Sequence, residues 1–394
     1  MNLLLSSKDL AFRDEVRRFL DKSITGAMQR AIDLTTGFII DPEILQDLHR
    51  ALNSNGWSVP PWPVEHGGTG WSPVQRYIFD LECGKAGVTT YNAAGSYFVG
   101  PVIIRYGTQE QRDKYLPRIR SGEDYWAQGF SEPSSGSDLA SLRTKAVSDG
   151  EDYVVNGQKI WTTNAHKANR IFALVRTTAT GKRQEGITFL LIDMDTPGIT
   201  VRPIIGSGGD HEFNEVFFND ARVPKSDRIG EENKGWEVAK YLLEFERGGR
   251  VLAGQVRAQF AKLVRQVAAL EPDSRDIALR LAEIGTDLDA MEMIDISMLS
   301  TLQTGGNPGP ISSLLKLRWS EIRQSIAELA MDVVGGDALR WMPERPIYEN
   351  LQLPQEEQEL LAAAPRYLNA RAFSIMGGTS EIQTNILAKT LVGL

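Results

Sequence analysis

A run of small and polar residues near the C-terminus has the composition of a ligand-binding turn. Residues 377–383 read GGTSEIQ, in which Ser380 and Gln383 have the spacing of a capping box at a helix start. A helix that begins there points unpaired N–H groups and the positive end of its dipole at the residues before it. We therefore expect Gly377 and Gly378 to let a cofactor or a thioester approach the backbone. A plain capped helix would have the same sequence pattern.

Two other clusters in the middle of the chain could carry chemistry. Residues 128–138 read QGFSEPSSGSD, and their small side chains would let backbone N–H groups and hydroxyls reach an anionic or ring-shaped ligand. Residues 161–164 read WTTN, where an indole can stack on a flat heterocycle while a neighbouring hydroxyl bonds a ring nitrogen. Taken alone, each has a simpler interpretation: a Ser/Gly-rich turn for the first, and a core tryptophan for Trp161.

The elements that must position these clusters follow from hydrophobic periodicity. Residues 1 to about 125 look mainly helical, and one early helical face carries Phe12, Val16, Phe19 and Leu20. Short β-branched and aromatic runs then predict a compact antiparallel β domain. After Trp236, apolar residues recur at intervals of three and four, which predicts long amphipathic helices packed as a bundle. The fold class is therefore α+β, with a helical domain at 1–125, a β domain at 126–232 and a helical bundle at 233–394.

Local signals mark individual elements within this division. Asn156-Gly157, between two apolar runs, predicts the type I′ turn of a hairpin because this pair readily takes positive φ angles. Further strands are expected at 170–176, 187–192 and 214–218. Pro272-Asp273-Ser274 can start a helix, whereas the glycine pairs at 305–306 and 335–336 cannot continue one.

Composition excludes several classes of function. The 394 residues are 42% hydrophobic, which is enough for a large core divided among two or three domains. A formal net charge of -8, with both signs interspersed, leaves no basic stripe for nucleic acid. A single cysteine, Cys83, excludes an intrachain disulfide, and four scattered histidines give no metal-site pattern. Since neither a signal peptide nor a long apolar run is found, we expect a cytoplasmic protein without a membrane span.

Together the three clusters have the order and approximate spacing seen in the acyl-CoA dehydrogenase family, and the resemblance covers nearly the whole chain. Residues 129–138 resemble the family's first signature, residues 161–164 its flavin strand, and residues 371–383 its second signature. The resemblance implies FAD as cofactor and the same helical, β, helical order. It also implies α,β-dehydrogenation of an acyl-CoA thioester to the trans-2-enoyl-CoA, with electrons passed to an electron-transfer flavoprotein.

Carried over position by position, the resemblance implies which residues touch the ligands. Those implied to contact FAD are Gln128, Phe130, Ser131, Gly136, Ser137, Trp161, Thr162, Thr163, Thr379, Ser380 and Glu381. Trp161 and Thr163 would lie against the isoalloxazine, and Glu381 departs from members that have glutamine at its position. Those implied to border the acyl-CoA are Ser137, Arg247, Gly377 and Gly378.

The position that usually carries the family's catalytic glutamate reads Gly377. Members resembling long-chain and isovaleryl-CoA dehydrogenases carry the base on a C-terminal-domain helix, immediately before an arginine, and this sequence has Glu246-Arg247. The resemblance thus implies Glu246 as the base. Without it, Glu246 would be interpreted as a solvated helix carboxylate. Glu244 is the nearest rival, but two positions along a helix it faces elsewhere.

Two departures from the family pattern concern assembly. An Arg-x-x-Phe-Gly motif reaches the FAD adenylate across the dimer interface of family homotetramers, but residues 269–275 here read ALEPDSR. Asp332 stands where a glutamine often precedes the Gly-Gly pair. Such losses resemble bacterial members that act on steroid side chains, dicarboxylic or ring-derived acyl-CoAs, some of them α2β2 assemblies. We expect a homotetramer or an α2β2 heterotetramer with a related chain, and a bulky, branched, dicarboxylic or ring-derived acyl group.

Two alternatives remain open at the level of sequence. The chain could be a non-catalytic or cofactor-sharing subunit of a heteromeric dehydrogenase, which Glu246 argues against. It could also be a flavin oxidase related to acyl-CoA oxidases, although 394 residues do not include the long extra C-terminal domain typical of those enzymes.

Overall fold

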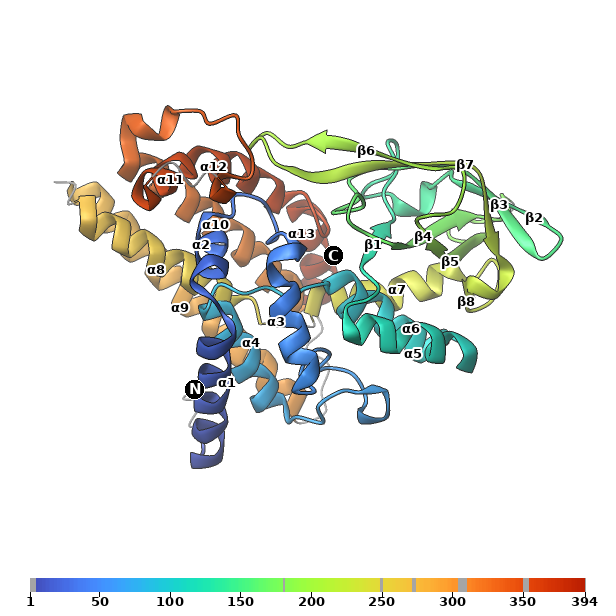
Figure 1. Ribbon diagram of the computed structural model, residues 1–394, viewed down its shortest axis with the longest axis horizontal. Coiled ribbons are helices and arrows are strands. Elements are labelled where there is room, and N and C mark those ends of the chain that lie inside the picture. Colours follow the sequence, from blue (N-terminus) through green and yellow to red (C-terminus); the bar gives the residue numbers. More distant parts are fainter. Residues whose placement is uncertain are drawn as a thin grey trace.

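The computed structural model describes residues 5–179, 181–248, 251–270, 274–303, 310–349 and 354–393. The chain forms a helical region, then a β-sheet, then a second helical region, and the two helical regions pack together beside the sheet (Figure 1). This order confirms the predicted α+β class. No helix within the described ranges combines the length and apolarity that crossing a bilayer requires.

The N-terminal helices begin where the local sequence caps them. In α1, α4 and α6 the N-cap side chain and the third helical residue exchange hydrogen bonds with each other's backbone, through Ser6 and Asp9, Ser72 and Gln75, and Thr108 and Gln111. The helices are α1 (Ser7–Ser23), α2 (Gly26–Leu34), α3 (Pro42–Ser54), α4 (Pro73–Lys85), η2 (Ala94–Val99), α5 (Gly100–Tyr106) and α6 (Gln109–Ser121).

The C-terminal helices follow the predicted periodicity. The Ile277 N–H donates to the Ser274 hydroxyl at 3.3 Å, so Ser274 starts a helix as predicted. Pro272, Asp273 and the glycines at 305–306 lie outside the described residues, while Gly335 follows the end of α10 with a φ of 65°. The helices are α7 (Gly235–Gly248), α8 (Ala253–Leu270), α9 (Arg275–Gln303), α10 (Ile311–Val334), α11 (Gln355–Leu361), α12 (Ala363–Ala370) and α13 (Ser380–Leu387).

Helices α4 and α8 join the two helical regions at a pair of glycines. A Cβ atom added to Gly84 would lie 2.9 Å from the Gly254 Cα atom, closer than side-chain carbons approach other heavy atoms. Only glycine therefore lets the two backbones cross at this separation.

The middle region is a mixed sheet in the order β6-β7-β3-β2-β4-β5-β8, with β1 pairing parallel to β4. Most neighbours are antiparallel, as predicted. The predicted strands at 170–176, 187–192 and 214–218 are present. The strands are β1 (Trp126–Gly129), β2 (Lys145–Asp149), β3 (Asp152–Lys159), β4 (Arg170–Arg176), β5 (Ile187–Asp193), β6 (Ile199–Ile205), β7 (His211–Pro224) and β8 (Arg228–Ile229).

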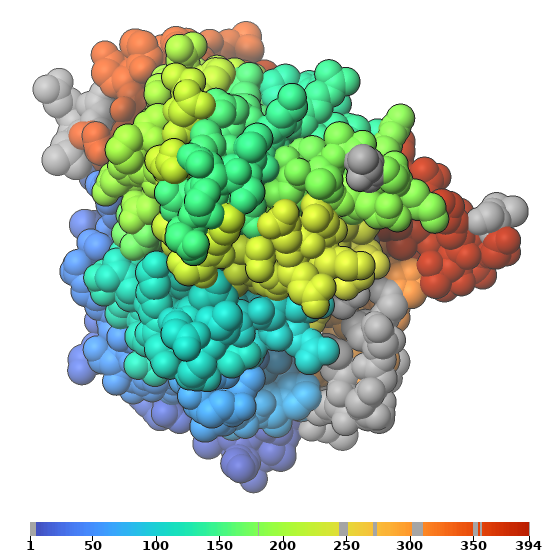
Figure 2. All heavy atoms as spheres, turned by 90° about the vertical axis from the view of Figure 1, so that its right-hand side faces the viewer, coloured from blue at the N-terminus to red at the C-terminus, as the bar shows by residue number. Residues whose placement is uncertain are grey.

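Strands β4 and β5 are buried on both faces, which explains their continuous apolar sequences. Phe172 and Phe189 pack toward the helices, whereas Ile171 and Leu190 pack toward β3 and β7. The sheet also joins α6, because the Tyr115 hydroxyl donates to Asp227 at 2.6 Å. Viewed from the sheet side, the β domain lies directly on the N-terminal helices (Figure 2).

The predicted hairpin turn at Asn156-Gly157 is wrong. Strand β3 runs through both residues, and the turn that joins it to β2 lies at Gly150 and Glu151 instead. Gly157 has a φ of 151° and sits at a bulge in the pairing with β7. The Asn156 amide exchanges two hydrogen bonds with Asp220, each 2.9 Å long. The positive φ that Gly157 allows is thus used in a bulge rather than in a hairpin turn.

Candidate active site

The first cluster begins at the end of β1 and continues into a surface turn. Gln128 is half-buried in the strand, Ser131 is half-buried after it, and Gly136 and Ser137 are exposed. The Phe130 ring is 5% exposed and packs edge-on against Phe172, with ring centroids 5.6 Å apart. The ring of Phe130 therefore belongs to the core, and its backbone is what remains for a ligand.

A buried ion pair holds this turn from behind. Lys159 Nζ lies 2.8 Å from Glu132 Oε1, and it donates to the Phe130 carbonyl at 3.2 Å. Glu132 also accepts hydrogen bonds from the backbone N–H groups of Arg143 and Thr144, at 2.6 and 2.9 Å. Both members of the pair are buried, and each is hydrogen-bonded. The turn is therefore a fixed platform.

Their mutual attraction keeps both members charged at neutral pH. Burial opposes the charged carboxylate, but Lys159 and the backbone donors hold the pKa of Glu132 below its ordinary value. Burial lowers the pKa of Lys159 to about 8, although Glu132 opposes this shift. We did not predict this pair from the sequence. The feature that could have indicated the pair is Lys159 itself, a charged residue next to Ile160 in a strand whose inward side chains are apolar.

The second cluster is joined to the first by the backbone, since the Ile160 N–H donates to the Ser131 carbonyl at 3.0 Å. Trp161 follows with a φ of 58° and is 58% exposed. Its indole packs only edge-on against Phe213, with centroids 6.1 Å apart. The core interpretation of Trp161 is therefore wrong: a flat aromatic face is open to a ligand.

The two threonines after Trp161 differ in their surroundings. Thr162 is 1% exposed, and its backbone N–H donates to the Asn214 carbonyl at 3.0 Å. Its buried hydroxyl oxygen has no hydrogen-bond partner in the described part of the chain. Thr163 is half-buried. Because a buried hydroxyl without a partner is costly, the Thr162 hydroxyl marks a place where a ligand atom or a water belongs.

The C-terminal run forms a helix start, one residue earlier than predicted. Thr379, rather than Ser380, is the N-cap of α13, and its hydroxyl accepts from the Ile382 N–H at 3.3 Å. The predicted capping box does not form, because the buried Gln383 side chain turns back and donates to the Gly377 carbonyl at 3.0 Å. The Ser380 hydroxyl donates to the Ser374 carbonyl at 3.4 Å. Gln383 thus shapes the glycine turn.

Gly377 and Gly378 are exposed, with φ angles of 63° and 84°. Their N–H groups make no hydrogen bond to other residues within the described ranges. Glu381 is exposed in the first turn of α13, where its own N–H and the Thr379 hydroxyl hold the pKa of its carboxyl below the ordinary value. The run therefore presents free backbone donors next to a carboxylate that stays charged.

The predicted base lies on α7, which packs against β5, η2 and α5. Glu246 and Arg247 belong to the last turn of this helix, but their side chains lie outside the described residues, as does that of Glu244. Their roles stay predictions.

The first two clusters are brought together by the Ser131–Ile160 hydrogen bond, whereas the third is held elsewhere. Gln324 on α10 donates to the Ser374 hydroxyl at 3.3 Å, at the start of the C-terminal run. Among the described residues, no hydrogen bond or ion pair joins residues 377–381 to either of the other clusters. A ligand in contact with all three clusters would therefore have to reach from the first two clusters to the third.

The chemistry of these residues fits FAD. Trp161 offers an open ring for stacking, and Thr162 a buried hydroxyl without a partner. At Gly136 an added Cβ would meet nothing within 4 Å, so the turn is open to a phosphate. The N-terminus of α13 at Thr379 supplies backbone donors suited to the negative groups of a dinucleotide.

Comparisons with known proteins identify the family. Models of the acyl-CoA dehydrogenase N-terminal, middle and C-terminal domains match residues 6–123, 127–221 and 233–392. The acyl-CoA dehydrogenase IpdE1 of Mycobacterium tuberculosis is 36% identical over 393 residues, which cover 97% of both chains.

Two solved structures are similar to this chain over its whole length. A chain of the Tcur3481-Tcur3483 steroid ACAD is 26% identical with a TM-score of 0.84, and covers 100% of this chain and 99% of its own. A chain of the ChsE4-ChsE5 complex from Mycobacterium tuberculosis is 29% identical with a TM-score of 0.81, at the same coverage. The chain described here belongs to the acyl-CoA dehydrogenase family, and it is an acyl-CoA dehydrogenase with FAD as its cofactor.

Proposed function

We propose that this enzyme dehydrogenates a bulky, steroid-derived acyl-CoA thioester to its trans-2-enoyl-CoA. The observation that carries the reaction type is the open face of Trp161 beside the unpaired Thr162 hydroxyl, a wall suited to a flavin ring. The substrate class is supported by the similarity to the Tcur3481-Tcur3483 steroid ACAD, at 26% identity over the whole chain.

Glu246 is the proposed base, and its carboxylate takes the α-proton of the thioester. FAD, when bound, accepts the β-hydrogen as a hydride. Glu246 lies in the last turn of α7, the first helix after the sheet. Because residue 377 is a glycine, its usual carboxylate is absent, and Glu246 is the carboxylate that the family pattern offers in its place.

The C-terminal glycines supply the second requirement of this chemistry. An α-proton of a thioester is far too weak an acid for a free carboxylate, so the site must stabilise the negative charge that develops on the thioester oxygen. The N–H groups of Gly377 and Gly378 are free within the described residues, and both residues are exposed. We propose that the Gly377 N–H donates to that oxygen. A backbone donor survives the loss of a side chain.

A glycine at 377 also supports a bulky acyl group. With no side chain there, more of the pocket is left for the substrate than when this position carries a carboxylate. The size of the pocket does not distinguish a ring system from a branched chain. The choice of a steroid-derived group therefore rests on the relatives.

We further propose that the enzyme works as an α2β2 assembly with a related chain. Asp332, at the position where a glutamine often precedes the Gly-Gly pair, forms an ion pair with Arg280 at 2.6 Å. The carboxylate is thus engaged within its own chain. The ChsE4-ChsE5 relative is a complex of two named proteins. In the proposed assembly the partner chain supplies the missing adenylate contacts.

A substrate panel tests the function. Straight, branched, dicarboxylic and steroid-derived acyl-CoAs are mixed anaerobically with the protein, alone and with candidate partner chains, and flavin bleaching is recorded. We expect the fastest bleaching with a steroid-derived acyl-CoA. No bleaching with any thioester, although FAD is bound, would contradict the proposed reaction, and faster bleaching by straight chains would contradict the substrate class.

The same preparations test the acceptor and the assembly. We expect reduced flavin to pass electrons to an electron-transfer flavoprotein faster than to oxygen, whereas an oxidase would show the opposite order. Tight FAD retention by a homotetramer of this chain alone would contradict the α2β2 proposal.

A further inference from the structure

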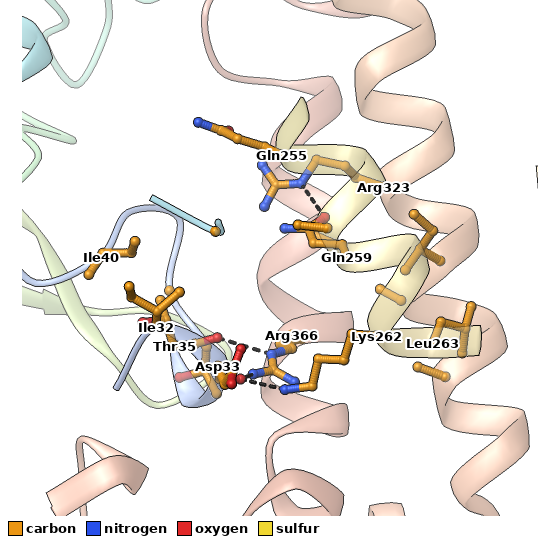
Figure 3. A pocket seen from close by; sticks show the side chains of 18 of the residues that line it. Ile32, Asp33, Thr35, Ile40, Gln255, Gln259, Lys262, Leu263, Arg323 and Arg366 are labelled. Carbon is orange, nitrogen blue, oxygen red and sulfur yellow. Dashed lines mark hydrogen bonds between the residues drawn. The ribbon is translucent and has the colours of Figure 1, made fainter. Parts of the chain in front are cut away.

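A cavity is found that none of the residues 128–138, 161–164 or 377–383 lines. It has a volume of about 290 Å³ and lies between α2 with the loop that follows it and helices α8, α10 and α12 (Figure 3). Neither the flavin wall, formed by Trp161 and Thr162, nor the C-terminal glycine turn at Gly377 and Gly378 contributes to its lining. The polar residues labelled in Figure 3 fall into two sets, with Asp33, Thr35, Lys262 and Arg366 at one end and Gln255, Gln259 and Arg323 at the other.

The groups at one end are satisfied by the protein. Lys262 Nζ donates to the Asp33 carbonyl at 2.5 Å, and Arg366 donates to the same carbonyl and to the Thr35 carbonyl. These carbonyls belong to the C-terminal end of α2, where a helix leaves backbone acceptors unpaired and favours cations. Lys262 and Arg366 therefore cap α2 and need no ligand.

Arg323 at the other end is different. Its Nε donates to Gln259 Oε1 at 3.1 Å, and its guanidinium carbon lies 3.9 Å from the Phe373 ring centroid and 4.8 Å from that of Trp319. Its two Nη groups make no hydrogen bond to any residue in the described ranges. The guanidinium extends from α10 between Gln255 and Gln259 toward the open space (Figure 3).

Among the described residues, no carboxylate forms an ion pair with Arg323. Glu212 is the acidic group that acts on it electrostatically, but the two Glu212 oxygens accept from the backbone N–H groups of Phe38 and Ile39, at 2.7 and 2.8 Å. Burial lowers the pKa of Arg323 to about 9, so the guanidinium is still charged at neutral pH. Arg323 is half-buried, and a charge withdrawn from water in this way without a partner is costly unless something binds it.

The remaining lining defines the rest of the ligand. Most of it is apolar, from Ile40, Leu263, Ile326, Ala327, Ala330 and Phe373. The volume equals that of about ten waters, which is at the lower end of the range for ligand pockets. A planar guanidinium fork matches a carboxylate through two parallel hydrogen bonds.

We propose that this cavity binds a small monocarboxylate with an apolar body, held by the Arg323 Nη groups. The carboxylate lies against Arg323, and the body extends along α8 and α10. Octanoate combines a carboxylate with an apolar body, and it serves as the probe.

The test is a calorimetric titration of the FAD-loaded protein, in the assembly in which it purifies, with sodium octanoate. Arg323→Met removes the charge and keeps most of the bulk. We expect it to weaken binding about 10- to 100-fold, the range for hydrogen bonds to a charged group. Arg222→Met is the matched control, because Arg222 pairs with Asp149 and Asp152 on the surface of the sheet. It should bind octanoate as the unmodified protein does.

A second variant guards against misfolding of the first. Ala330→Leu fills part of the cavity and leaves Arg323 in place, and we expect it to weaken octanoate binding at least about tenfold. Binding that survives both substitutions lies elsewhere and overturns the proposal, as does no binding by the unmodified protein at millimolar octanoate. Equal affinity for octanol overturns the role of Arg323, and equal affinity for inorganic phosphate overturns the amphipathic class.

Discussion

Lys159 in the β domain is a buried cation and Arg323 in the helical region a half-buried one, but among the described residues only Lys159 has a counter-ion. Lys159 meets Glu132 at 2.8 Å and also a backbone carbonyl. Arg323 has one hydrogen bond, to a neutral glutamine, and open space beside its Nη groups. Lys159 needs no further partner, so its role is to hold the turn behind the flavin wall. Arg323 lacks a charged partner, and this is why we assign it a ligand.

The strongest test of this contrast is Glu132→Gln. It leaves Lys159 buried without a counter-ion, and breaking a buried ion pair in this way costs about 3–5 kcal/mol. We expect that loss in the free energy of unfolding by urea. The double variant Glu132→Gln/Lys159→Met removes both charges and should recover most of it. A single-variant loss below about 1 kcal/mol would show that the pair does not hold the turn.

Asp295 on α9 lies between the cases of Lys159 and Arg323, because it is only partly hydrogen-bonded. One carboxylate oxygen accepts from the Ala253 N–H at 3.3 Å, and the other has no partner among the described residues. Burial, with Glu292 and Asp80 nearby, raises its pKa to about 7. The folded protein therefore holds this proton more tightly than the unfolded chain does. Its stabilising contribution is complete below pH 4 and is lost as the pH rises through about 7.

Asp295→Asn should remove this part of the pH dependence. An asparagine oxygen can still accept from Ala253, so we expect a gain of about 1–2 kcal/mol at pH 5 and a gain of about 4 kcal/mol at pH 8. Urea unfolding at both pH values measures the difference. Some slope of the same sign should remain, because burial also raises the pKa of Glu212 to about 7. An equal effect of the substitution at both pH values would contradict this account.

Arg323→Met should behave in the opposite way to Glu132→Gln. It removes a charge that has no counter-ion and keeps contact with Phe373 and Trp319, so we expect stability within about 1 kcal/mol of the unmodified protein. Thermal and urea unfolding in the absence of added carboxylates measure it. A loss above about 3 kcal/mol would make Arg323 a structural residue like Lys159.

Trp161→Ala should have the smallest effect on stability. The side chain is 58% exposed, so we expect a change below about 0.5 kcal/mol. Loss of the aromatic face should still weaken FAD binding about 3- to 10-fold, measured by flavin fluorescence on titration. Trp126→Ala is the contrasting control. That indole is 1% exposed, and its removal should cost about 3–5 kcal/mol. Unchanged FAD affinity in Trp161→Ala would remove it from the flavin wall.

Local sequence predicted the elements better than it predicted their connections. The strand at 170–176 and the helix start at Ser274 follow from short-range patterns and are confirmed. Asn156-Gly157 was predicted as a turn because its φ preference is local, but whether it closes a hairpin or a bulge depends on pairing with β7. The cap moved from Ser380 to Thr379 because Gln383 found the Gly377 carbonyl instead.

Lys159 and Arg323 show what the sequence alone does not reveal. Glu132 is 27 positions from Lys159, and the cavity beside Arg323 is bounded by helices from both ends of the chain. Nothing in the neighbouring residues indicates that one cation is paired and the other is not. The candidate flavin residues were accessible to prediction because they lie in short contiguous signatures.

The most direct test of the central claim concerns the relocated base. Glu246→Gln and Glu244→Gln are compared for flavin bleaching by the best acyl-CoA of the panel, under anaerobic conditions and with FAD content measured for each. We expect Glu246→Gln to retain FAD and to lose at least about 100-fold in the bleaching rate, while Glu244→Gln stays close to the unmodified enzyme. Full bleaching by Glu246→Gln would contradict the account.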